Sequence, residues 1–139
     1  MQQEKPKDIK KNHNNWVPDL AFGKEGETWF SKLGEETTVE VKRDKKWHST
    51  RNIFFEISCS GKPSGIMSTE AHYIAYLLSK DGKQVGAYLF ETIALRRAIS
   101  EALNAGLGRK VRGGDGFRVE GIVFSLVEVS VLLEYMGKY

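Results

Sequence analysis

Two short segments with alternating apolar and polar residues constrain the fold of this chain more than any other feature. Valines take one face of the run from Thr37 to Arg43, and apolar residues recur in the same way from Asn52 to Cys59. Alternation with a period of two is typical of β-strands that bury one face. The polar segment 44–51 between them suits a loop, so the two strands are predicted to pair as a hairpin.

Such a hairpin would have a direct consequence for two acidic side chains. Glu40 would lie opposite Glu56, with their side chains about 5 Å apart. Two carboxylates at that separation repel each other unless a cation lies between them. Glu27 is a third acidic residue in apolar surroundings, on the expected inward arc of a helix predicted over 19–33. We expect the three glutamates to converge within about 8 Å and to hold a divalent metal, Mg²⁺ or Mn²⁺.

The rest of the chain mixes strands and helices. The expected elements are a strand over 73–78, a turn at Asp81 and Gly82, a strand over 85–90, a helix over 92–105, a strand over 122–126, and a last strand or short helix over 128–135. In 139 residues this predicts a single domain of the α/β (α+β) class. Residues 1–15 are polar and Lys-rich, which predicts a flexible basic arm before a domain over 16–139.

Composition narrows the classes of function. A formal net charge of +3 permits a polyanionic partner. The lone cysteine, Cys59, excludes an intrachain disulfide and indicates a reducing, cytoplasmic location; it is expected to be a small core residue. Since no apolar run is long enough for a membrane span and no signal peptide is visible, a membrane location is not expected.

Two groups of basic residues could contact the phosphates of a nucleic acid. The first group comprises Arg43, Lys45, Lys46, Trp47, His48 and Arg51. Its Trp47 offers a surface for stacking or wedging. The second group comprises Arg109, Lys110 and Arg112. It belongs to a glycine-rich loop expected over 109–116, whose amides could bind phosphate. The alternative for each group is a solvated turn.

Five blocks of the sequence resemble the PD-(D/E)XK nucleases, in particular the small stand-alone type common in phages and mobile elements. The blocks are LAFGKEGETWF, TVEVKRD, NIFFEIS, KPSGIMSTEAHY and RGGDGFRVEG, and together they cover most of residues 19–127. The resemblance implies a restriction-endonuclease-like fold, in which helices flank a mixed central sheet. It also implies Mg²⁺-dependent hydrolysis of DNA by a homodimer, in the cytoplasm of a bacterial host if the chain is phage-encoded.

The resemblance also implies roles for single residues. Glu27 resembles the helix glutamate of the resolvase-like branch, and Glu40 with Lys42 matches the Glu-x-Lys motif. Lys42 shares a strand face with Glu40, where a lysine can position water or stabilise the charge of the phosphorane. The alternative for Glu40 and Lys42 is an exposed ion pair. The earlier aspartate of the family has no clean counterpart, since Asp19 follows Pro18 but is expected to cap the helix.

A second alignment assigns the acidic residues differently. It makes Glu40 the aspartate equivalent and Glu56 the start of a degenerate Glu-x-Lys, with the lysine supplied by Lys42. We prefer it because it also explains the expected pairing of the two glutamates. Asp44 is a weaker ligand candidate, and its place at a strand end also suits a turn. His72 stands where such nucleases often have aspartate.

Three functions are compatible with these residues. The first is an endonuclease of the junction-resolving, restriction-like or homing type. The second is a catalytically inactive nuclease fold that binds nucleic acid or protein. The third is an unrelated α+β interaction domain with surface carboxylates. The joint presence of Glu40, Lys42 and Glu56 favours the first, because an inactive site need not keep them.

Overall fold

The computed structural model describes residues 24–33, 35, 37–113 and 118–138. The chain divides into two compact units, residues 1–37 and 38–139. In the first unit the structure describes a helix over 24–33, which falls within the range expected for a helix. The expected basic arm over 1–15 and the first turn of the expected helix lie outside the described residues.

The helix over 24–33 differs from expectation in what it buries. Leu33 is its only buried residue, while Trp29 and Phe30 are 51% and 67% exposed. Glu27 is exposed as well. The expectation that Glu27 faces an interior is therefore wrong for the described part of this unit. A helical period identifies an apolar arc, but it does not show what covers the arc.

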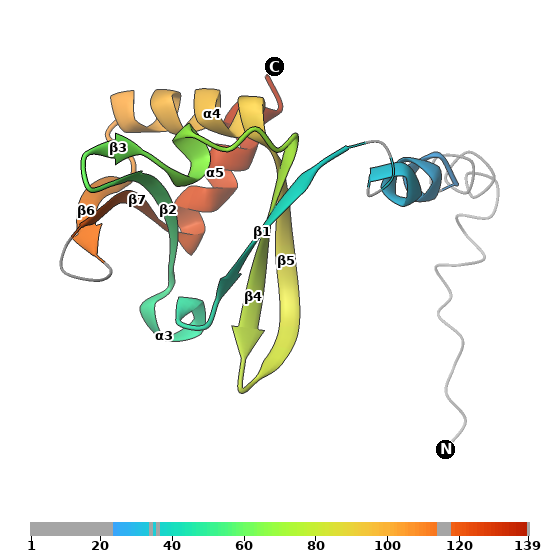
Figure 1. Cartoon of the computed structure of the whole chain (residues 1–139), viewed down its shortest axis with the longest axis horizontal. Coiled ribbons are helices and arrows are strands. Elements are labelled where there is room, and N and C mark those ends of the chain that lie inside the picture. Colours follow the sequence, from blue (N-terminus) through green and yellow to red (C-terminus); the bar gives the residue numbers. More distant parts are fainter. Residues whose placement is uncertain (1–23, 34, 36, 114–117, 139) are drawn as a thin grey trace, which may run out of the picture. The chain divides into compact units, whose positions relative to one another are not determined.

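The described residues of the second unit form two sheets (Figure 1). One has the strand order β1-β4-β5, with β1 parallel to β4 and β4 antiparallel to β5. The other has the order β3-β2-β7-β6 and is antiparallel throughout. The strands are β1 (Val39–Asp44), β2 (Asn52–Cys59), β3 (Lys62–Pro63), β4 (Tyr73–Lys80), β5 (Lys83–Glu91), β6 (Arg109–Gly113) and β7 (Val119–Ser125).

The expected hairpin between the two alternating segments is wrong. Both strands form, but β1 pairs with β4 and β2 pairs with β7, so Glu40 and Glu56 belong to different sheets. A short helix, α3 (Trp47–Thr50), joins β1 to β2 in place of the expected loop (Figure 1). Arg51 follows it with a left-handed φ of 59° and leads the chain into the second sheet. The buried face of β1 also differs from expectation, because Val39 and Val41 are 36% and 57% exposed while Glu40 and Asp44 are partly buried. Alternation predicts a strand, whereas its partner and the face that it buries depend on contacts distant in sequence.

Most of the remaining expectations are confirmed, and two are not. The helices α4 (Thr92–Asn104) and α5 (Leu126–Met136) form, the second of them from the segment that suited either a strand or a helix. The expected loop over 109–116 is wrong in its first part, where β6 forms the edge of the second sheet, and 114–116 lie outside the described residues.

Cys59 is exposed instead of buried, because it ends β2 beyond the core. The α+β class is confirmed for the described residues, but their strands form one mixed sheet and one antiparallel sheet instead of a single mixed central sheet.

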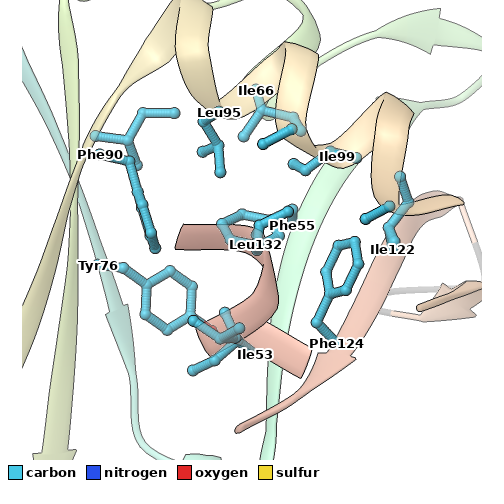
Figure 2. Packing of buried hydrophobic residues seen from close by; sticks show 14 residues of the cluster. Ile53, Phe55, Ile66, Tyr76, Phe90, Leu95, Ile99, Ile122, Phe124 and Leu132 are labelled. Carbon is cyan, nitrogen blue, oxygen red and sulfur yellow. The ribbon is translucent and has the colours of Figure 1, made fainter. Parts of the chain in front are cut away.

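One buried cluster joins both sheets to α4 and α5 (Figure 2). Phe55 of β2 makes edge-on contacts with Tyr76, Phe90 and Phe124, at ring-centroid distances of 6.0, 5.7 and 6.1 Å. Two of these rings come from the first sheet and one from the second. Such aromatic pairs stabilise a fold beyond their burial by about 0.5–1.5 kcal/mol each. Among the described residues, no helix is both long and apolar enough to cross a bilayer.

Glu128 takes part in the N-terminal cap of α5. Its carboxylate accepts hydrogen bonds from the backbone N–H of Ser125 at 2.8 Å and of Gly108 at 2.8 Å, while the Ser125 hydroxyl accepts from the N–H of Glu128. This capping box satisfies donors that the first turn of a helix leaves free. The hydrogen bonds from Gly108 and then Ser125 favour the charged carboxylate and hold the pKa of Glu128 below its ordinary value.

Replacing Glu128 with alanine should lower the free energy of unfolding by about 1–3 kcal/mol at neutral pH, because two backbone donors lose their acceptor. A lowered folded-state pKa means that this contribution is complete above the ordinary value of 4.5 and fades as the pH falls below it. Urea denaturation of Glu128→Ala and the parent from pH 7 to pH 3 measures the difference. Glu134→Ala, at an exposed position of α5, is the control and should change stability little at any pH.

Candidate functional site

A cleft of about 580 Å³ opens where β1 and β2 approach each other. Its lining includes Glu40, Lys42 and Asp44 from β1 and Asn52, Phe54 and Glu56 from β2. Alternate residues of a strand point to the same face. Most of these side chains thus come from one face of each strand, although Arg43 and Phe55 from the opposite faces line the cleft too. The two strands belong to different sheets. The core cluster lies next to it, since Ile66, Ile74 and Tyr76 also line the cleft.

Glu40 and Lys42 form an ion pair at the rim of this cleft. The distance from Lys42 Nζ to Glu40 Oε1 is 3.6 Å, and their side chains remain 46% and 32% exposed, respectively. An ion pair with this much water access contributes little to stability, about 0–1 kcal/mol. Both charges are therefore available to a ligand at small cost to the fold.

Asp44, by contrast, is fully engaged within the protein. Its Oδ1 accepts hydrogen bonds from the backbone N–H of Lys46 at 2.7 Å and of Trp47 at 3.0 Å, and its Oδ2 accepts from the Tyr76 hydroxyl. These bonds shape the turn from β1 into α3. The turn role foreseen for Asp44 is the one that the structure shows, and its lone pairs are largely occupied.

The Tyr76 hydroxyl ties the two strands of the cleft together. It donates to Asp44 of β1 and accepts from the backbone N–H of Phe54 of β2 at 3.3 Å. Burial, followed by the hydrogen bond to Asp44, raises the pKa of Tyr76 well above its ordinary range. The phenol therefore stays protonated and keeps donating. Sequence reasoning missed Tyr76, although a tyrosine on the apolar face of a predicted strand signals a hydroxyl that needs a partner.

A turn of the short 3₁₀ helix η1 (Gly65–Met67) supports Glu56 from behind. Gly65 has a φ of +55°, and a Cβ there would lie 2.3 Å from the carbonyl oxygen of Glu56 and 2.8 Å from its Cβ. Arg96 of α4 holds this turn in place, because its guanidinium donates to the carbonyls of Ile66 and Thr69. Glu56 is thus held between its own sheet and a turn anchored on a helix.

The two basic groups are placed differently relative to the cleft. Arg43, Lys45 and Lys46 line it. Trp47 is half-buried and its indole N–H donates to the carbonyl of Ser79 at 2.9 Å, so its ring helps fix α3. Arg51 is exposed and is absent from the lining of the cleft.

The second group lies on β6 and not in a loop. Lys110 and Arg112 line a separate hollow of about 200 Å³, and Arg112 pairs with Glu120 at 3.1 Å. Arg109 shares a sheet row, and therefore a face, with Phe54 through their common neighbour Val123. Only Arg109 of this group thus stands on the face of the sheet that lines the cleft.

The contacts of His72 give it a structural role. Its Nδ1 lies 3.3 Å from the backbone nitrogen of Thr38 and 3.2 Å from the Thr38 hydroxyl. The backbone N–H of His72 also donates to that hydroxyl at 3.2 Å. These contacts fix the start of β1 against the start of β4.

Two carboxylates of the cleft are of the kind that a hard divalent cation prefers. No group of three or more His, Cys, Asp or Glu side chains suited to a metal occurs among the described residues. Glu40 and Glu56 nevertheless line one cleft. Magnesium is often held by one or two carboxylates, with waters and substrate phosphate completing the shell. The two glutamates fit that requirement, while Glu27 belongs to the other unit and its convergence with them stays a prediction.

Comparisons of the chain with protein-family models, curated proteins and solved structures find no significant match. What the chain does must therefore be inferred from the chemistry of the cleft.

Gly65→Ala should displace Glu56 because the new methyl group would collide with the Glu56 backbone. Gly61→Ala is a matched control: Gly61 also has a positive φ, +77°, but nothing lies within 4 Å of its added Cβ. Both variants carry the left-handed strain of about 1–2 kcal/mol, and Gly65→Ala should lose about 1–3 kcal/mol more through overpacking. Urea denaturation measures both losses, and equal losses would show that the turn does not support Glu56.

Proposed function

We propose that this chain is a metal-dependent DNA endonuclease, of the junction-resolving, restriction-like or homing type. One observation carries the proposal: Glu40, Lys42 and Glu56 line a single cleft, and Arg43, Lys45 and Lys46 line it too. Carboxylates for a metal, a water-accessible lysine beside them and a basic border are groups that hydrolysis of a phosphodiester uses. In this proposal the α+β fold is a restriction-endonuclease-like fold.

Each residue then has a defined task. Glu40 and Glu56 would hold Mg²⁺ or Mn²⁺, which supplies a bound water of lowered pKa and neutralises phosphate charge. Lys42, 3.6 Å from Glu40, is close enough to hydrogen-bond a phosphate oxygen in the same cleft and to stabilise its developing charge. Arg43, Lys45 and Lys46 contact neighbouring phosphates, which fixes the strand in register.

The proposal extends to the assembly and to the residues outside the cleft. A homodimer, related by a two-fold axis, would bring two clefts to the two strands of one DNA. Further candidates for DNA contact lie outside the catalytic group: Arg51, Arg109, Lys110, Arg112 and Trp47. The enzyme would act in the cytoplasm.

A second function is favoured by one specific observation. The described residues hold no cluster of three potential metal ligands. A nuclease fold that binds nucleic acid or protein without cleaving it needs no such cluster. In that case the basic lining of the cleft would be retained and the metal would be dispensable.

Glu40→Gln should abolish Mg²⁺-dependent cleavage, because the amide keeps the size of the side chain but removes a negatively charged ligand. The parent protein should gain thermal stability with Mg²⁺ and Glu40→Gln should lose most of that gain, since a ligand that binds the folded state stabilises it. Cleavage is measured on a panel of plasmid, single-stranded, flap and four-way-junction DNA. Glu134→Gln is the matched control. A parent that binds DNA with equal affinity with or without Mg²⁺, and never cleaves it, would support the binding module.

Lys42→Ala should leave the Mg²⁺-dependent rise in melting temperature nearly intact, because lysine is no ligand. Cleavage in a single turnover should fall by roughly a hundredfold or more, the scale of losing one charge-stabilising donor. DNA binding in Ca²⁺ at fixed salt should weaken far less. The exposed Lys83 provides the control Lys83→Ala. Cleavage by Lys42→Ala at the rate of the parent would make Lys42 a surface ion-pair partner only.

A further inference from the structure

Phe54 is an aromatic side chain placed among the charged residues of the cleft. It lines the cleft with Glu56, two positions along the same face of β2, and it is neither fully buried nor fully exposed. Its neighbours Ile53 and Phe55 point to the other face and are buried at 0% and 2% exposure. Phe54 is therefore outside the core cluster, on the face that Glu56 shares.

The position of the ring depends on a glycine in the adjacent strand. Gly121 of β7 lies opposite Glu56, and a Cβ on it would come within 2.3 Å of the Phe54 ring. The ring therefore lies against bare backbone, where a larger residue would push it away. The backbone of Phe54 is also fixed, because its N–H donates to the Tyr76 hydroxyl at 3.3 Å.

The charges that line the cleft with the ring are mixed, with the cations in excess. Lys42, Arg43, Lys45 and Lys46 are basic and Glu40, Asp44 and Glu56 acidic. Arg109 adds a further cation in the sheet row of Phe54. An aromatic face bordered by cations is the combination that proteins use for single strands: the ring stacks on a base while the cations contact the backbone phosphates. A base inside a duplex is stacked on its neighbours, so only an unpaired or extruded base can reach such a ring.

We propose that Phe54 is a stacking platform for an unpaired nucleobase next to the scissile phosphate. The substrate class is then DNA with an unpaired base at that position, as in a flap, a bulge or a single strand, and fully paired duplex is a poor substrate. This inference rests on the proposed function, because it places the base beside the residues assigned to cleavage. Phe54 is a residue that sets specificity and takes no part in proton or metal chemistry.

The test crosses two proteins with two substrates. The parent and Phe54→Leu are each given a flap DNA and the same DNA with an abasic site at the unpaired position nearest the cut. Affinity is measured by fluorescence anisotropy in Ca²⁺, and cleavage by single turnovers in Mg²⁺. Phe54→Leu should bind the flap roughly tenfold more weakly, as expected for the loss of one stacked base. On the abasic DNA, the two proteins should bind alike.

Matched variants separate stacking from a change in shape. Phe54→Tyr keeps an aromatic face and should keep the affinity of the parent for the flap. Gly121→Ala should displace the ring and reproduce the loss seen in Phe54→Leu. Val41→Ala removes an exposed apolar side chain of β1 and should change neither substrate's affinity. Where Phe54→Leu does not fold, as judged by its melting curve, Phe54→Met carries the same comparison.

Two results would overturn the inference. An equal loss of affinity for the flap and for the abasic DNA would give Phe54 a purely structural role. A parent that cleaves or binds paired duplex as well as the flap would remove the unpaired base from the substrate. Failure of the proposed function looks different: neither DNA is cleaved in Mg²⁺, while the affinity measurements in Ca²⁺ still report on stacking.

Discussion

The hydroxyl of Tyr76 is the contact on which the arrangement of the cleft depends. It stands between the two sheets, donating to a carboxylate of β1 and accepting from the backbone of β2. A phenol buried in an apolar core needs partners, since an unpaired hydroxyl there costs about 1–3 kcal/mol. Here the partners come from strands that share no ladder. The same hydrogen bonds therefore satisfy the buried group and set the spacing of the strands that line the cleft.

The position of β1 in its sheet explains why its charged residues lie at the cleft. In its rows, Glu40 lies beside Ile74, which lies beside Phe90, and both of these apolar side chains are buried. On this face of the sheet, the residues of β5 and β4 are buried and apolar, whereas the residue of β1 is charged and partly exposed. Because β1 is the edge strand of that sheet among the described residues, its carboxylate and lysine reach water while their row neighbours hold the strand rigid. The cleft therefore lies where the hydrophobic core meets the solvent.

The sequence predicts local features of this fold well and long-range ones poorly. Period-two alternation identified both strands of the cleft, β2 with its observed bounds, and singled out Glu40, Lys42 and Glu56. It assigned the wrong pairing, because a parallel partner for β1 lies beyond a whole strand and turn of sequence. Glu40, Lys42 and Glu56 nevertheless line one cleft, although they come from strands of two different sheets. Tyr76 and Phe54 escaped notice, since their roles depend on neighbours that only the folded chain brings close.

Cys59 adds a practical property to the chain. It is the one cysteine of the sequence, it is exposed, and it ends the strand that carries Phe54 and Glu56. A thiol-reactive dye would therefore attach at a single known position without any substitution, and the rigid strand would couple that dye to the cleft. The same exposure makes oxidation a hazard: without a reducing agent, two chains can join through their Cys59 thiols, and such a covalent pair would be mistaken for a native dimer.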